Sequence, residues 1–272
     1  MHTRIIPSTG EKLPVVGLGT WQSFDVASAA AHPNLSRVLT GLQAAGATVI
    51  DSSPMYGRSE GVIGDLTAAL AGRDGYFYAT KVWTTGEHEG IRQMETSMKL
   101  MRRSRLDLIQ VHNLTDWRTH LGTLRRWKET GKVRYLGLTH YTDSSHEELE
   151  RLMRTEKVDF VQFNYSIAHR HAEQRLLAAS ADLGVATIIN RPLGEGSLFA
   201  RVRNKPLPGW AGELGIQSWS TYFLKYLIAH PAVTCVIPAT ANPVHLSENL
   251  AAGEGPLPDR ARRKQMAEYL GL

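Results

Sequence analysis

Short, nearly continuous apolar runs alternate along this chain with longer segments in which apolar residues recur every three or four positions. The first kind is typical of strands buried on both faces, and the second of helices that bury one face. The pattern predicts strands at 14–20, 48–51, 76–81, 106–111, 133–138, 159–163, 185–189 and 233–237. It predicts helices at 33–45, 59–71, 87–102, 117–130, 143–155, 172–182, 217–229, 242–250 and 258–269.

The order of these elements determines the predicted fold. Eight strands that alternate with helices fit an α/β protein, a closed (β/α)8 TIM barrel, with residues 1–272 in a single domain. Residues 3–13 add a short N-terminal hairpin, and a C-terminal helix follows the barrel. An open doubly wound sheet is the alternative. It is disfavoured because no Gly-x-Gly-x-x-Gly follows the first strand.

Ionisable side chains stand where three consecutive predicted strands end. Asp51 ends the second strand and is followed five positions later by Tyr56, while Lys81 and His112 end the next two. In a parallel barrel these ends share one face, where active sites of such barrels are found. Each residue alone has an ordinary explanation, such as a helix cap or a surface charge. A carboxylate, a phenol, an amine and an imidazole together form a proton-transfer site.

The same four residues carry a resemblance to a known family. In order and position they resemble the catalytic tetrad of the aldo-keto reductases, and the similarity covers nearly the whole chain. The resemblance implies an NAD(P)H-dependent oxidoreductase of the EC 1.1.1 type that reduces aldehydes or ketones to alcohols. Tyr56 would be the general acid, and Lys81, paired with Asp51, would lower the pKa of its phenol. His112 would donate a hydrogen bond to the carbonyl oxygen and orient it.

The resemblance also implies a site for the nicotinamide and pyrophosphate of the cofactor. Gln162 matches the glutamine that contacts the carboxamide, and Thr139-His140 stands where the family usually has Ser-Asn. Asn190 replaces the aromatic residue that many relatives stack on the nicotinamide, while Arg191 suits stacking or a phosphate contact. The other expected contacts of this half are Gly19, Thr20, Trp21, Pro192, Leu193, Gly196 and Leu198.

The same resemblance assigns binding of the adenosine half of the cofactor to the segment after the eighth strand. Glu248 and Asn249 match residues that contact the adenine. Ala239 and His245 stand where relatives often have Lys and Arg for the 2′-phosphate, so Thr240 and His245 would hold it more weakly. NADPH is therefore the expected cofactor, with NADH open. The expected contacts are Ile237, Pro238, Ala239, Thr240, His245, Glu248 and Asn249.

The expected substrate pocket is apolar. Trp21, Trp83 and Tyr165 stand where the family builds its pocket walls, although each is equally suited to packing. Many relatives close this pocket with a long C-terminal tail. Here Leu272 closely follows the last predicted helix, which favours an open pocket and broad substrate acceptance.

Composition limits the expected localisation and partners. Hydrophobic residues make up 42% of the chain and charged residues 21%, which is ordinary for a soluble globular protein. Apolar runs stay shorter than the ~18 residues needed to span a bilayer, and a single cysteine, Cys235, suits a reducing cytoplasm. The net charge of +5 is scattered along the chain. We therefore expect a small carbonyl substrate, no nucleic acid or membrane partner, and a monomer or simple homo-oligomer.

Alternatives to a carbonyl reductase stay open. The altered cofactor positions, 139–140 and 190–191, allow an NADPH-binding sensor or regulatory subunit with little turnover. The segment His169-Arg170-His171 invites a metal site and, more distantly, a metal-dependent barrel hydrolase. Zinc needs three or four ligands, and no cysteine or carboxylate motif accompanies these histidines. A structural or substrate-loop role is therefore favoured for them, and no metal is expected.

Overall fold

The computed structural model describes residues 1–29 and 32–272, and at its centre is a barrel of eight parallel strands. The strands pair in chain order, and bridges from Val16 to Val236 and from Gly19 to Ala239 join the first to the last. Their bounds are β3 Leu18–Gly19, β4 Val49–Asp51, β5 Phe77–Val82, β6 Leu106–His112, β7 Val133–Thr139, β8 Phe160–Asn164, β9 Ala186–Asn190 and β10 Cys235–Val236. The predicted (β/α)8 barrel is confirmed.

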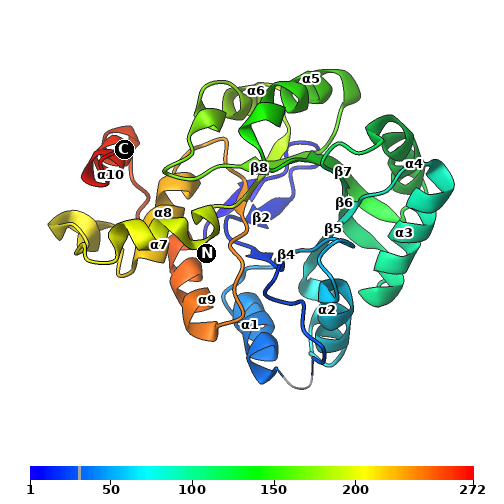
Figure 1. Cartoon of the computed structure of the whole chain (residues 1–272), viewed down its shortest axis with the longest axis horizontal. Coiled ribbons are helices and arrows are strands. Elements are labelled where there is room, and N and C mark those ends of the chain that lie inside the picture. The colour runs from blue at the N-terminus through cyan, green and yellow to red at the C-terminus, as the bar shows by residue number, and fades with distance from the viewer. Residues whose placement is uncertain (30–31) are drawn as a thin grey trace.

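Helices surround this barrel, as Figure 1 shows. They are α1 Pro33–Ala44, α2 Ser59–Ala68, α3 Glu87–Leu100, α4 Trp117–Glu129, α5 His146–Glu156, α6 Leu176–Asp182, α7 Ser197–Val202, α8 Trp219–Ile228, α9 Pro243–Leu250 and α10 Arg260–Tyr269. The C-terminal α10 packs on α8, where the Tyr222 hydroxyl donates to the Met266 carbonyl oxygen at 2.8 Å. Within the described residues, every helix is too short or too polar to cross a membrane.

Glycines in the first strand are needed for the barrel to close. A Cβ on Gly19 would lie 2.7 Å from the carbonyl oxygen of Ile237, and one on Gly17 would lie 2.8 Å from the Cβ of Val49. Real Cβ atoms do not tolerate such contacts, so β3 fits between its two neighbours only with glycine at these positions. The glycines of this segment therefore serve packing of the barrel.

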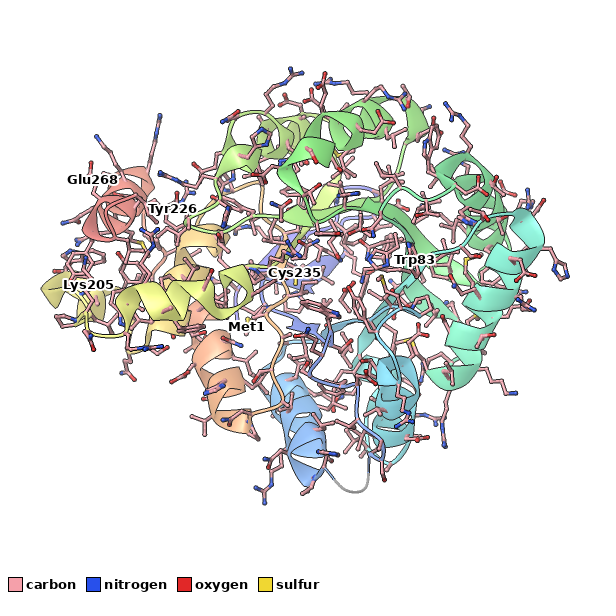
Figure 2. All side chains as sticks on the ribbon, in the orientation of Figure 1. Met1, Trp83, Lys205, Tyr226, Cys235 and Glu268 are labelled. Carbon is pink, nitrogen blue, oxygen red and sulfur yellow. The ribbon has the colours of Figure 1, made fainter. Side chains whose placement is uncertain are left out.

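The N-terminal hairpin closes the amino-terminal end of the barrel. Its strands, β1 Thr3–Ile5 and β2 Lys12–Pro14, pair antiparallel, as predicted. Ile6 and Leu13 are buried among the side chains that fill the barrel interior, including Cys235, which Figure 2 shows near the centre of the ring. Because this end is filled, the carboxyl ends of the strands remain as the face on which a site can form.

Several segments differ from the sequence-based prediction, and the first strand, expected at 14–20, is confined to β3. The eighth strand was expected at 233–237, but its ladder is confined to β10 because Thr187 and Thr234 replace backbone pairing there. Each of their hydroxyl oxygens accepts the backbone N–H of the other residue at 2.9 Å. The segment 194–198, for which no element was predicted, forms a short 3-10 helix, Gly194–Gly196, that leads directly into α7.

Candidate active site

Asp51 and Lys81 form a buried ion pair at the carboxyl end of the barrel. Asp51 is the last residue of β4, and Lys81 is the next to last of the neighbouring β5. Lys81 Nζ lies 2.6 Å from Asp51 Oδ2 and donates a second hydrogen bond to the Ser52 carbonyl oxygen at 2.8 Å. Neither side chain is more than 2% exposed. Two opposite charges are therefore held in place where water cannot screen them.

A tight turn after β4 places Tyr56 beside this pair. The Tyr56 N–H donates to the Ser53 carbonyl oxygen at 3.0 Å, and the Ser59 hydroxyl donates to the Tyr56 carbonyl oxygen at 2.8 Å. Gly57 follows with a φ of +60°, and a Cβ there would collide with the Asp25 carboxylate. The turn thus needs glycine at position 57, and it holds the phenol ring with its centroid 5.0 Å from Lys81 Nζ.

His112 ends β6 and completes the group. Its ring meets the ring of Tyr56 edge to face, with centroids 6.0 Å apart and an interplanar angle of 85°. The structure therefore brings together all four ionisable residues that the sequence pattern singled out.

Burial and charge set the protonation of this group. Burial raises the pKa of the Tyr56 phenol, and this effect outweighs the Lys81 ammonium, which lowers the pKa as expected from the sequence. The net shift is upward, which corrects the expectation of a lowered pKa. Burial also opposes the charge of Lys81, but the adjacent Asp51 and Tyr56 raise the pKa of its amine above the usual value. At neutral pH the phenol carries its proton and the amine is charged.

His112 is uncharged over the physiological range. Burial, with smaller contributions from the positive charge of Lys81 and from His140, lowers the pKa of its imidazole to about 3. Nδ1 of this ring lies 3.1 Å from the hydroxyl oxygen of Ser53. That oxygen also accepts the backbone N–H of Met55 at 3.3 Å. Ser53 was not among the residues selected from the sequence.

Two glutamines hold the second oxygen of the Asp51 carboxylate. Gln110 Nε2 donates to Asp51 Oδ1 at 3.2 Å, and Gln162 Nε2 donates to the same atom at 3.0 Å. The Thr139 hydroxyl donates to Gln162 Oε1 at 3.2 Å, which orients that amide. Gln110 was missed in the sequence, although it precedes His112 by two positions and so lies on the same face of β6.

A cavity of about 740 Å³ opens above these residues. Its walls include Asp51, Tyr56 and His112, while Lys81 lies beneath them. The sequence-selected residues that line it are Gly19, Thr20, Trp21, Trp83, Thr139, His140, Gln162, Asn190, Arg191, Pro192, Leu193, Gly196, Ile237, Pro238 and Ala239. Lining residues that were not selected are Gln22, Ser23, Met55, Asn113, Tyr141, Glu195 and Phe199. Trp83, labelled in Figure 2, is 43% exposed at this cavity.

Several selected residues lie elsewhere. Tyr165 is fully buried outside the cavity, where its hydroxyl donates to Glu173 and accepts from Arg263. Asn249 is also buried, and its side-chain oxygen accepts from the Ser220 hydroxyl. Thr240 and Leu198 are buried as well, Glu248 is half-buried and His245 is exposed on α9. These placements assign Tyr165 to packing and not to a pocket wall.

Two aromatic rings and a guanidinium group stack on one another at one rim of the cavity. The rings of His140 and Tyr141 lie 5.3 Å apart at an interplanar angle of 9°. The Arg191 guanidinium lies 4.5 Å from the centroid of Tyr141 and pairs with Glu195 at 2.9 Å. Arg191 therefore stacks as its residue type suggested, and the ring beneath it belongs to Tyr141.

Comparison with known proteins places this site in a family. The model of the Aldo/keto reductase family matches residues 15–264, which include the ion pair, Tyr56 and His112. The chain belongs to the aldo/keto reductase family.

Relatives of this aldo/keto reductase family member cover most of its length. Methylglyoxal reductase YeaE of Escherichia coli (strain K12) is 26% identical over 263 residues, 93% of this chain and 90% of the relative. An aldo-keto reductase of Mycobacterium sp. (strain JLS) is 24% identical over 246 residues, 88% of this chain and 83% of the relative.

Solved structures share the same barrel. An aldo-keto reductase from Klebsiella pneumoniae in complex with NADPH has a TM-score of 0.83 at 23% identity, over 98% of this chain and 95% of that chain. The holo form of an aldo-keto reductase from Bacillus halodurans has a TM-score of 0.79 at 18% identity, over 99% and 96% of the two chains. At such identities the similarity concerns the fold.

Proposed function

We propose that this chain is an NAD(P)H-dependent oxidoreductase that reduces aldehydes or ketones to alcohols. The observation that carries the proposal is the position of the Tyr56 phenol, which lies beside the buried Lys81–Asp51 pair in the wall of a large cavity. An acid positioned over a buried cation is what protonation of a carbonyl oxygen requires. Membership of the aldo/keto reductase family supports the same reaction.

The polar groups of the cavity fit a nicotinamide carboxamide. Asn190 Nδ2 donates to the His140 carbonyl oxygen at 3.1 Å. Asn190 Oδ1 is buried and, among the residues that the structure describes, has no hydrogen-bond partner. It is therefore ready to accept an amide N–H, beside the amide of Gln162 and the hydroxyl of Thr139. A nicotinamide bound there would supply the hydride that the substrate carbon receives.

The proton that the substrate oxygen receives comes from a side chain of the protein. Tyr56 donates its phenolic proton to the carbonyl oxygen, and Lys81 stabilises the phenolate that remains. Asp51, held by Gln110 and Gln162, keeps the ammonium in position. In the reverse reaction, alcohol oxidation, the phenolate of Tyr56 would accept the proton of the alcohol.

We assign to Ser53 the task of orienting His112. The Ser53 oxygen accepts the Met55 N–H, and we assign its hydroxyl hydrogen as the donor to Nδ1 of His112. Nε2 then carries the ring proton and donates it to the substrate carbonyl. Ser53→Ala is expected to lower kcat about fivefold, since one net hydrogen bond is worth about 1 kcal/mol. Steady-state kinetics check the rate, and ¹⁵N NMR of the imidazole checks the tautomer. An unchanged kcat with an unchanged tautomer would remove this role.

The rate of reduction is expected to depend little on pH near neutrality. Since the pKa of His112 is lowered to about 3, no titration is expected near the ordinary histidine value of 6.5. Since the pKa of Tyr56 is raised, kcat/KM is expected to begin falling only above the ordinary phenol value of 10.0, as the proton donor is lost. A pH profile of kcat/KM with saturating cofactor measures both. A break near 6.5 would contradict the uncharged imidazole.

Cofactor choice follows from the segment 240–245. The proposed contacts to a 2′-phosphate are the exposed His245 and the hydroxyl of Thr240, which accepts the Asn242 N–H at 3.0 Å. An imidazole binds phosphate more weakly than a guanidinium. We therefore expect tighter binding of NADPH than of NADH, with a modest ratio between the two affinities.

The first experiment is a titration of the apo-protein with NADPH and then NADH, followed by quenching of tryptophan emission. Trp21 and Trp83 line the cavity, so binding there is expected to quench them. Consumption of NADPH is then measured with a panel of carbonyls that begins with methylglyoxal, the substrate in the name of the Escherichia coli relative. Saturable binding with turnover is the expected result. Binding without turnover across the panel favours the sensor hypothesis, and no binding of either nucleotide overturns both.

A further inference from the structure

A second cluster of chemically capable side chains lies outside the cavity. Asp143 begins the 3-10 helix Asp143–Ser145 that follows β7, His146 begins α5, and His171 begins the 3-10 helix that follows β8. One ligand atom of each lies within 4.8 Å of the other two. The fold thus gives His171 two partners that are distant from it in the sequence, while His169 is not part of the group.

Asn164, the last residue of β8, orients two members of the cluster. Its Oδ1 accepts the Nε2–H of His146 at 3.0 Å, and its Nδ2 donates to Asp143 Oδ1 at 2.6 Å. With its proton on Nε2, His146 presents a lone pair on Nδ1, which faces Nδ1 of His171 at 2.9 Å. An outer partner that sets the tautomer of a histidine and the position of a carboxylate is typical of metal sites.

We propose that Asp143, His146 and His171 bind one divalent transition-metal ion of the zinc type. Two imidazole nitrogens and a carboxylate oxygen match the ligand preferences of zinc, and three protein ligands leave a fourth position for water. His146 is 3% exposed and His171 lies at the surface, so the ion can enter from solvent and rest against a rigid inner ligand. The two Nδ1 atoms lie 2.9 Å apart, so binding of the ion would require the rings to move slightly apart.

The alternative to a metal site is an imidazole pair that is joined by one hydrogen bond and binds no ion. In that case Asp143 would have no role beyond its hydrogen bond with Asn164.

A bound ion would connect two loops at the rim of the barrel. Asp143 and His146 belong to the connection after β7, which also carries His140 and Tyr141 of the cavity wall, and His171 belongs to the connection after β8. The ion would therefore stabilise the loop that carries this wall, and it takes no part in the proton transfer described above. A ligand that binds only the folded chain raises the melting temperature.

The test uses the full chain without an affinity tag, stripped with a chelator. Zinc chloride is titrated into the wild type, His171→Ala and His169→Ala by isothermal calorimetry, and cobalt(II) absorption reports the ligand geometry. The wild type is expected to bind one ion per chain and to melt at a higher temperature with zinc. His171→Ala is expected to bind at least about tenfold more weakly, since loss of even an outer partner of a ligand costs that much. His169→Ala, the matched control, is expected to bind as the wild type does.

Two results would overturn the proposal. Failure of the wild type to bind zinc would leave the imidazole pair as a simple hydrogen bond. Equal binding by the wild type and His171→Ala would place the ion elsewhere on the chain. Both results are independent of the NADPH titration, so the reductase proposal and the metal proposal can fail separately.

Discussion

Replacing Tyr56 by phenylalanine is expected to lower kcat for carbonyl reduction by about 10²- to 10⁴-fold, the range that a positioned general acid contributes. The substitution removes one hydroxyl and keeps the ring that lies over Lys81 and against His112. The fold and the cavity should therefore survive. The affinity for NADPH, measured by tryptophan quenching, is expected to stay within about threefold of the wild type, because the phenol acts on the substrate oxygen.

Tyr141→Phe provides the matched control. Tyr141 also lines the cavity and is 41% exposed, and its stacking on His140 and under Arg191 uses the ring alone. Loss of this hydroxyl is expected to change kcat less than about twofold, as for most exposed substitutions. If the Tyr56 variant kept more than about a tenth of the wild-type rate, the proton would have to come from another group or from water.

The barrel and the four converging residues could be predicted because their signals are local. Each strand that carries one of them is a short apolar run with the ionisable residue at its end, and parallel strands bring such ends to one face. Gln110 could have been predicted in the same way, since alternation along β6 puts it on the face of His112. The glycines at 17 and 19 indicated a close approach of the backbone, but only the structure shows that Ile237 and Val49 are the groups approached.

Other features depend on residues that are distant in the sequence. Tyr165 follows directly after β8, but its hydroxyl is satisfied by Glu173 and by Arg263 on α10, which draws the ring into the helical layer. The direction of the pKa shift of Tyr56 could be predicted only once its burial was known, because burial raises the pKa by more than the nearby ammonium lowers it. Likewise, nothing near His171 in the sequence indicates that His146 faces it.

The stability of the fold and the catalytic activity are expected to depend in different ways on the Asp51–Lys81 ion pair. Lys81→Met removes one charge of a pair that is almost completely buried and should lower the free energy of unfolding by about 3–5 kcal/mol. Asp51→Asn is expected to be similarly costly, because the buried ammonium would lose its opposite charge. Urea unfolding, followed by circular dichroism and tryptophan emission, measures both losses.

The double variant Asp51→Asn with Lys81→Met separates the two roles of the pair. With both charges gone, no buried charge lacks a partner, so its loss of stability is expected to be well below the sum of the single losses. Lys81→Met is expected to have a low kcat, because no ammonium is left to stabilise the Tyr56 phenolate. The double variant should have an equally low kcat for the same reason. Additive losses of stability would show that the two groups are not coupled. Recovery of stability without activity would mean that the chain retains a costly buried ion pair for its chemistry, since the fold can do without it.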